Sequence, residues 1–253
     1  MIKMTNVLKM AAAAALMVSG IASTVVQAAE LPIKDGQKIA FLGDSITQAG
    51  AGPKGYVRLV ISGLEASGVK TTAIPAGISG HKSNQMLARL EKDVLSKKPD
   101  WMTLSCGVND VWHGANGVLL DQYKVNITKI VDQAQAAGIK VMLLTSTMIG
   151  EDQSNANNQK LLPYNEFLKA LAKEKSCLFA DLNADMQAAI AKVGAAKKGN
   201  LLTSDGVHMN PEGNKMMAAG VLKAFGLSAD QIGQAQKAWA VVPAAAVPGG
   251  AAK

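Results

Sequence analysis

Five short, nearly continuous apolar runs alternate along the chain with longer segments of helical period. Runs without polar alternation are typical of strands covered on both faces, and strand–helix alternation favours a parallel sheet with right-handed crossovers. The sequence therefore predicts one doubly wound, flavodoxin-like α/β domain of three layers, whose five-stranded parallel sheet has the order 2-1-3-4-5. The expected strands are residues 38–43, 71–74, 101–106, 140–146 and 178–181, and the helices that follow each of them in turn are 56–67, 83–96, 120–137, 158–175 and 183–193.

Two further helices are expected after the last strand. Asn210 can cap a helix whose first position is Pro211, and this helix would end near Gly226. A last short helix is expected over residues 228–240. Gly68 and Gly138 follow earlier helical segments in the manner of C-caps.

The first 28 residues have the pattern of a secretory signal peptide. Lys3 and Lys9 precede an apolar stretch over residues 10–22, and Val26-Gln27-Ala28 places small residues three and one before a cleavage point. An uncleaved anchor is the alternative, because residues 10–29 carry no charge. We expect cleavage and a secreted or periplasmic protein without stable membrane insertion, with a domain over residues 29–241 and a flexible tail over 242–253.

Charge and cysteine content exclude some classes of partner and cross-link. The formal net charge is +7, with no basic block and only ten aromatic residues, so nothing predicts a nucleic-acid partner. Cys106 and Cys177 would lie at opposite ends of a parallel sheet, too far apart for a disulfide. We expect both to be small buried side chains.

The first candidate for chemistry is Ser45, which follows Gly43-Asp44 at the end of the first expected strand. In open α/β sheets, ligands bind at the carboxyl ends of the strands, where this hydroxyl would be exposed. The alternative is a plain strand-to-helix turn in which Ser45 is a helix cap.

A candidate base lies near the other end of the domain, in Asp205-Gly206-Val207-His208. An aspartate three residues before a histidine can accept the Nδ1 proton and leave Nε2 free to act on an external hydroxyl. His113 has Asp110 at the same spacing, so spacing alone does not reject that pair. Its neighbours favour a different role for Asp110, as a cap of the local turn.

Two further segments end at the same predicted edge. Asn109 would project from the end of the third strand and could donate its amide to an oxyanion. Gly80 follows the second strand and would let backbone N–H groups approach a ligand. Because strands 2, 1 and 3 are neighbours in the expected order, Gly80, Ser45 and Asn109 would converge on one site.

With these four segments in order, the chain resembles the SGNH/GDSL family of serine hydrolases. The matching blocks are Gly43-Asp44-Ser45, Gly77-Ile78-Ser79-Gly80, Gly107-Val108-Asn109-Asp110 and Asp205-Gly206-Val207-His208. The resemblance implies that Ser45 is the nucleophile, His208 the general base and Asp205 its orienting carboxylate. It also implies an oxyanion hole from the backbone N–H groups of Ser45 and Gly80 and the side chain of Asn109, with no metal or other cofactor.

The chain departs from the family pattern after Gly80, where His81 and Lys82 stand. In one alternative, both side chains face the substrate. In the other, His81 packs on the following helix and Lys82 is exposed to solvent. We expect Asp44, His81 and Trp112 to contact substrate, and the polar segment 150–158 to form a loop at the site.

The predicted function is an exported serine hydrolase that cleaves carboxylic esters through an acyl-enzyme. A short acyl group such as acetyl on a carbohydrate is the expected substrate, so the partner is a small-molecule or carbohydrate ester. The alternatives are a lysophospholipase or thioesterase of the same family, and a non-catalytic carbohydrate-binding protein.

Overall fold

The computed structural model describes residues 30–196 and 198–240, so the expected signal peptide and the expected tail lie outside the described residues. The described part forms a five-stranded parallel sheet in the order β2-β1-β3-β4-β5, as the apolar runs predicted. The strands are Lys38–Gly43 (β1), Thr72–Gly77 (β2), Trp101–Ser105 (β3), Lys140–Leu144 (β4) and Leu178–Ala180 (β5).

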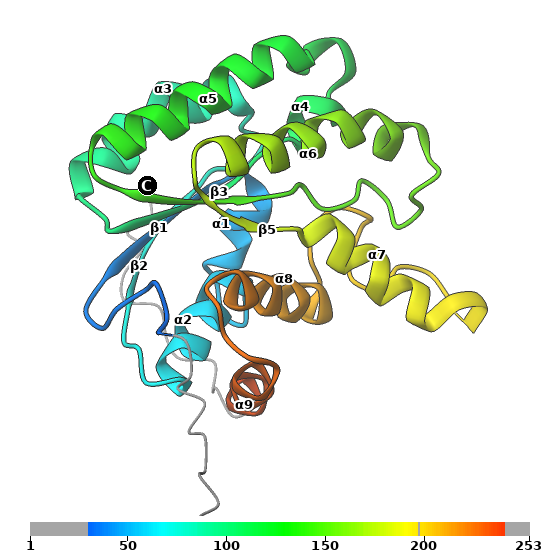
Figure 1. Ribbon diagram of the computed structural model, residues 1–253. Helices are drawn as coiled ribbons and strands as arrows, with labels where there is room; N and C mark the ends of the chain where they lie inside the picture. The colour runs from blue at the N-terminus through cyan, green and yellow to red at the C-terminus, as the bar shows by residue number, and fades with distance from the viewer. Residues whose placement is uncertain (1–29, 197, 241–253) are drawn as a thin grey trace, which may run out of the picture. The chain divides into compact units, whose positions relative to one another are not determined.

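Helices cover both faces of this sheet and make a three-layer domain (Figure 1). One layer contains α3, α5 and α6, and the other contains α2, α8 and α9. The helices are Ser45–Gly50 (α1), Tyr56–Ala66 (α2), Ser83–Asp93 (α3), Val108–Trp112 (α4), Leu120–Ala136 (α5), Ala156–Glu174 (α6), Leu182–Val193 (α7), Pro211–Ala224 (α8) and Ala229–Trp239 (α9). Short 3₁₀ turns occupy Leu95–Lys97, Gly114–Asn116 and Gly194–Ala196.

The core lies between the sheet and these layers. All five residues of β3 are buried, as are residues 39–43 of β1, because these central strands are covered on both sides. The apolar side chains of the inner helix faces complete one large cluster around them. Burial of this apolar surface is the main favourable contribution to folding.

The strand register brings the carboxyl ends of β2, β1 and β3 level with one another. Gly43 at the end of β1 is opposite Gly77 of β2, and Leu42 is opposite Leu104 of β3. Helix α1 packs against the end of β2 so closely that a side chain at Gly77 would collide with the backbone of Gln48. The residues that follow these three strands therefore meet at one edge.

Several expected boundaries are corrected. Two short helices, α1 and α4, were not predicted, so Asn109, which was expected to project from the end of the third strand, lies in a helix. Strand β2 runs on through Pro75 to Gly77, while β3 and β4 end earlier than expected. The polar loop is shorter than expected, because α6 begins at Ala156.

Other local predictions concern helix caps and the two cysteines. Gly68 and Gly138 have φ values of +84° and +77°, the left-handed conformation of a C-cap glycine. Asn210 caps α8, its Oδ1 accepting from the backbone N–H groups of Glu212 and Gly213 at 2.9 and 3.0 Å. Cys106 and Cys177 are both free, and Cys106 is buried as expected, whereas Cys177 is only half-buried, so the expectation for Cys177 is wrong. Among the described residues, no helix is long and apolar enough to cross a membrane.

Candidate active site

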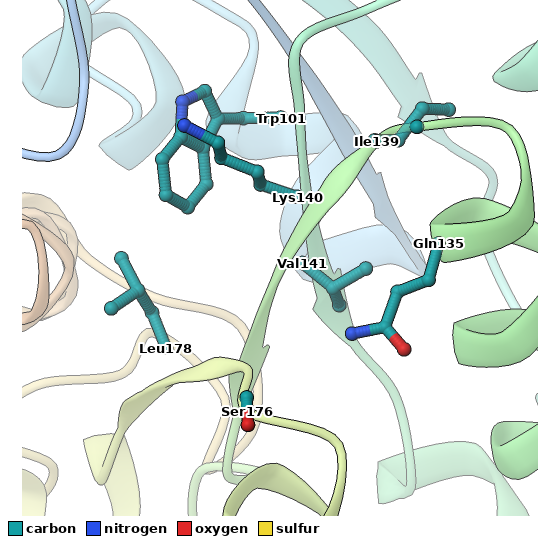
Figure 2. Close-up of a pocket in the computed structure, with 8 residues that line it drawn as sticks. Trp101, Gln135, Ile139, Lys140, Val141, Ser176 and Leu178 are labelled. Carbon is teal, nitrogen blue, oxygen red and sulfur yellow. The ribbon is translucent and has the colours of Figure 1, made fainter.

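One open cavity, of about 440 Å³, lies at the edge of the sheet where the strands begin (Figure 2). Its lining includes Trp101, Lys140 and Leu178, the first residues of β3, β4 and β5. The Lys140 ammonium lies 5.2 Å from the centre of the Trp101 ring. Ser45 follows the opposite, carboxyl end of β1, so this cavity is not where the predicted residues meet.

Ser45 is the first residue of α1, directly after β1. The chain turns there because Asp44 caps the helix, its Oδ1 accepting from the N–H of Ile46 at 2.9 Å. The cap is thus Asp44 and not Ser45. The hydroxyl of Ser45 is left for a partner outside the helix.

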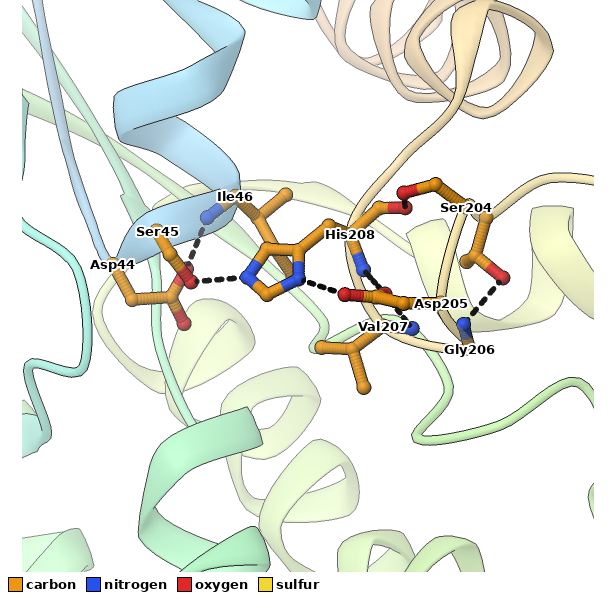
Figure 3. A network of polar contacts seen from close by, with 9 residues as sticks. Asp44, Ser45, Ile46, Ser204, Asp205, Gly206, Val207 and His208 are labelled. Carbon is orange, nitrogen blue, oxygen red and sulfur yellow. Dashed lines mark hydrogen bonds and ion pairs between the residues drawn. The ribbon is translucent and has the colours of Figure 1, made fainter.

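That partner is His208, from the far end of the domain (Figure 3). Its Nε2 lies 2.9 Å from Ser45 Oγ, and its Nδ1 lies 2.6 Å from Oδ2 of Asp205. Because an ionised carboxylate only accepts, the Nδ1 proton points to Asp205 and Nε2 is free to accept from the serine hydroxyl. The three side chains form a chain of hydrogen bonds suited to activating an oxygen nucleophile.

The Asp205 carboxylate is fixed by its own turn. Its Oδ1 accepts from the N–H groups of Val207 and His208 at 2.9 and 2.8 Å, which leaves Oδ2 for the imidazole. Partial burial raises the pKa of Asp205, but the His208 ring and these N–H groups outweigh it and lower the pKa to about 2. Asp205 is therefore ionised throughout the neutral range.

The competing Asp110/His113 pair does not form within the described chain. Asp110 accepts from the N–H and hydroxyl of Ser83, with the shortest distance 2.6 Å to Ser83 Oγ. His113 Nε2 instead lies 3.1 Å from Oδ1 of Asn109. Asp110 thus ties α4 to the start of α3, and the expected cap of its local turn is wrong.

Gly80 and Asn109 lie at the edge that carries Ser45. Gly80 has φ +73°, and the N–H of the preceding Ser79 donates to Gln48 Oε1 at 2.7 Å, which ties this turn to α1. Asn109 lies on α4, one residue past its start, and not on the strand end that was expected. Neither the Gly80 N–H nor the Ser45 N–H has a hydrogen-bond acceptor among the described residues.

The Asn109 amide is buried, with 4% of the residue exposed. Its Nδ2 donates to Asp44 Oδ2 and to the carbonyl of His81, each over 3.3 Å. These bonds are long for N–H···O contacts, so an incoming oxyanion can compete for the same donor. His113 fixes the amide from the other side through Oδ1.

Asp44 was expected to contact substrate, but its contacts are with the protein. Only 2% of it is exposed, and its two oxygens are used by Ile46 and Asn109. Burial is the main cause that raises its pKa to about 6, helped by the charge of Asp110.

His81 packs on the following helix, one of the two alternatives for this residue. Its Nδ1 accepts from Nε of Arg89 on α3 at 3.1 Å, and burial together with the Arg89 charge lowers the pKa of His81. The neutral ring is therefore protonated on Nε2. Lys82 donates to the carbonyl of Asn116 at 2.8 Å.

Sequence reasoning missed Arg89, which joins the ends of two strands. Its two terminal nitrogens donate to the carbonyls of Ala76 and Gly43, both at 2.8 Å. A lone arginine within an amphipathic helix gives no motif, so only the folded arrangement reveals this role.

Trp112 ends α4, one turn beyond Asn109, and 46% of it is exposed. Residues three apart share a side of a helix, so the indole lies on the side of α4 that carries Asn109. Among the described residues, no group of three or more His, Cys, Asp or Glu side chains could hold a metal ion.

Comparison with known proteins identifies the family. Residues 41–216 match the model of the GDSL-like lipase/acylhydrolase family. An acetylxylan esterase of Geobacillus stearothermophilus is 29% identical over 218 residues, which cover 78% of this chain and 97% of that protein. Esterase TesA of Pseudomonas aeruginosa is 33% identical over 110 residues, which cover 43% of this chain and 53% of TesA.

Solved structures agree with this result. The crystal structure of the acetyl xylan esterase AlAXEase superposes with a TM-score of 0.69 at 36% identity, over 74% of this chain and 98% of its own. Axe2, an acetylxylan esterase from Geobacillus stearothermophilus, superposes with a TM-score of 0.69 at 27% identity. The match covers 78% of this chain and 97% of the Axe2 chain. The chain belongs to the GDSL-like lipase/acylhydrolase family, the SGNH hydrolases, and is a carboxylic-ester hydrolase.

Proposed function

We propose that the protein is an exported serine esterase that removes acetyl groups from carbohydrates through an acyl-enzyme on Ser45. The observation that carries the mechanism is the hydrogen-bonded series from Ser45 Oγ to His208 at 2.9 Å and from His208 to Asp205 at 2.6 Å. The relatives provide independent support, because catalytic mutants of Axe2 alter an aspartate, a histidine and a serine. That aspartate and histidine are three positions apart, as are Asp205 and His208.

The reaction proceeds in two halves. Ser45 Oγ attacks the ester carbonyl while its proton passes to His208 Nε2, and the developing oxyanion accepts from the N–H groups of Ser45 and Gly80 and from Asn109. His208 then gives that proton to the departing alcohol oxygen, and the acetyl group stays on Ser45. In the second half, water attacks the acetyl-serine, loses its proton to His208 and releases the acid, and the proton returns to Ser45.

A bulky alcohol such as a sugar suits the exposure of the site. The side chains of His208 and Asp205 are 36% and 52% exposed, so the base sits at an open surface that a polymer can reach. Trp112 presents an exposed indole on the Asn109 side of α4, where it can stack on a sugar ring. The acetylxylan esterases among the relatives support acetyl as the acyl group.

Substrate profiling tests this function. Acetylated xylo-oligosaccharides and p-nitrophenyl esters from acetyl to dodecanoyl are compared by kcat/KM, with Ser45→Ala as the blank. We expect the acetyl esters to be the best substrates and the rate to fall as the chain lengthens. A rate that rises with chain length would indicate a lysophospholipase or thioesterase instead.

Export is tested on the full-length gene product. Cleavage after Ala28 gives a mature chain that begins at Ala29, which N-terminal sequencing of protein from the extracellular or periplasmic fraction detects. An intact N-terminus on membrane-bound protein would indicate the uncleaved anchor instead.

A further inference from the structure

The segment that leads into the Asp205–His208 turn is bound by a carboxylate from another loop. Glu151 follows β4, and its Oε2 accepts from the N–H of Leu201 at 2.6 Å. Its Oε1 accepts from the N–H groups of Leu202 and Thr203 at 2.7 and 2.8 Å. Since only 8% of Glu151 is exposed, these bonds form away from most of the solvent.

The hydroxyl of Thr203 extends this contact into the turn itself. It donates to Glu151 Oε1 at 2.8 Å and accepts from the N–H of Gly206 at 3.1 Å. Gly206 lies between Asp205 and His208 and has φ +94°, in the left-handed region that glycine adopts readily and that residues with a side chain rarely do.

The other side of Gly206 is held by the same loop. Its carbonyl accepts from the N–H of Gly150 at 2.6 Å. The loop of Gly150 and Glu151 therefore fixes both polar groups of Gly206, the carbonyl directly and the N–H through Thr203. Figure 3 shows how this turn carries the His208 ring toward Ser45.

Glu151 is suited to this task as an ionised group. Burial raises the pKa of Glu151, but the N–H groups of residues 201–203 and the Thr203 hydroxyl outweigh burial and lower the pKa. The carboxylate therefore accepts these bonds throughout the neutral range. Bonds to a charged acceptor are stronger than neutral ones, which favours a fixed geometry.

We propose that Glu151 is a positioning residue, which acts through the Thr203 hydroxyl and Gly206 to hold His208 against Ser45. The inference rests on the proposed function, because it assumes that His208 is the base. Misplacement of a catalytic group by about 1 Å costs on the order of 100-fold in rate, so loss of this support should appear in kcat.

The central experiment compares Thr203→Val with Thr203→Ser. Valine keeps the size of threonine but removes the hydroxyl that links Glu151 to Gly206, whereas serine keeps the hydroxyl. Thr103→Val is the matched control, because Thr103 is also buried and its hydroxyl has no partner among the described residues. Glu151→Gln is the second variant, because it removes the charge at nearly constant size.

The readouts separate positioning from folding. For Thr203→Val and Glu151→Gln we expect kcat on p-nitrophenyl acetate to fall about 10- to 100-fold, with KM within a few-fold of wild type. Thr203→Ser should recover most of the rate, and Thr103→Val should match wild type. In proton NMR, the downfield signal of the His208 Nδ1 proton should broaden or shift in the two impaired variants only.

Three results would overturn the proposal. The first is a wild-type kcat in both Thr203→Val and Glu151→Gln. The second is a loss of activity in these variants that only follows the folded fraction. The third is failure of both variants to fold, which would make Glu151 a purely structural residue. The NMR signal does not depend on turnover. If wild type and Ser45→Ala hydrolyse esters equally, the proposed function fails, while the effect on His208 is still measured.

Discussion

Nε2 of His208 lies 2.9 Å from Oγ of Ser45, although 163 residues separate them in the chain. Ser45 is held by the cap of α1 and His208 by a turn just before α8, so two independent segments determine this distance. A hydrogen bond of this length lets the proton pass to the imidazole as the oxygen attacks.

A serine-reactive fluorophosphonate should label Ser45 alone, because only this hydroxyl is bonded to a histidine Nε2 in the described chain. Peptide mass spectrometry identifies the labelled residue. Ser204→Ala is the matched control, since Ser204 lies beside the same turn and its hydroxyl donates to the His208 carbonyl at 3.1 Å. Labelling that persists in Ser45→Ala would contradict the assignment of the nucleophile.

Replacing His208 should lower kcat by about 100- to 10,000-fold, the usual contribution of a general base. In wild type, kcat/KM should rise with pH, because only neutral His208 accepts the serine proton. Asp205, with a pKa lowered to about 2, cannot be the source of that rise. Stopped assays from pH 4 to 9 measure the pH dependence of kcat/KM.

His113→Ala serves as the control for that experiment. His113 bonds to Asn109 and not to Asp110, so its loss removes one neutral hydrogen bond, worth about 1 kcal/mol or about fivefold in rate. The pH profile should keep its shape. A profile that flattens in His113→Ala and persists in His208→Ala would transfer the role of base to His113.

Trp112→Ala should raise KM for acetylated xylo-oligosaccharides several-fold and leave p-nitrophenyl acetate unaffected. The indole is 46% exposed, so it contributes little to the core and can contact a long substrate. Leu119→Ala is the matched control, because Leu119 is 82% exposed and lies beyond α4. Equal effects on both substrates would count against a sugar contact.

The architecture could be predicted because each central strand is a continuous apolar run. Strands β3 and β4 are buried on both faces, so their sequences are apolar runs without polar alternation, which can be recognised in the sequence. Helices α1 and α4 have six and five residues, too few for a helical period to be visible. The signal that could have revealed α1 is Asp44, a favoured cap residue directly before Ser45.

The motif residues of the site could be predicted for a similar reason, since each follows a strand or lies three residues from its partner. Glu151 could not, because its partners are backbone N–H groups of residues 201–203, about 50 positions away. Almost every residue type has a backbone N–H group, so no pattern of side chains in the sequence indicates which ones bind Glu151. Arg89 escapes detection in the same way, through its bonds to two backbone carbonyls.

Asn109→Ala should lower both kcat and stability. Removal of one oxyanion donor costs on the order of 100- to 1000-fold in kcat, with little change in KM, because the ground-state carbonyl uses that donor less. Asn109 is buried and is a donor to Asp44, so the variant also leaves that carboxylate short of a partner, at about 1–3 kcal/mol. Kinetics on phosphonate-titrated enzyme and thermal unfolding measure the two effects separately. A destabilised variant with wild-type kcat would contradict the oxyanion role.

Asp44→Asn should change how stability depends on pH. Because burial raises the pKa of Asp44 from 3.8 to about 6, the folded protein holds this proton over a range in which the unfolded chain has released it. Asp44 therefore makes the wild-type protein progressively less stable as pH rises from about 4 to 6, by about 3 kcal/mol at 1.36 kcal/mol per unit.

Asparagine keeps the helix cap and removes this ionisation, so the variant should gain stability relative to wild type across that interval. Urea unfolding at half-unit steps from pH 4 to 7 measures the difference. Asp121→Asn, at a fully exposed side chain, is the control and should parallel wild type. Asp205, whose pKa is lowered, acts in the opposite sense: the stability that its ionised form contributes is lost as pH falls from about 4 toward 2. Asp205 therefore does not contribute to the change between about pH 4 and 6. A constant difference between Asp44→Asn and wild type from pH 4 to 7 would mean that the buried carboxylate titrates as if it were solvated.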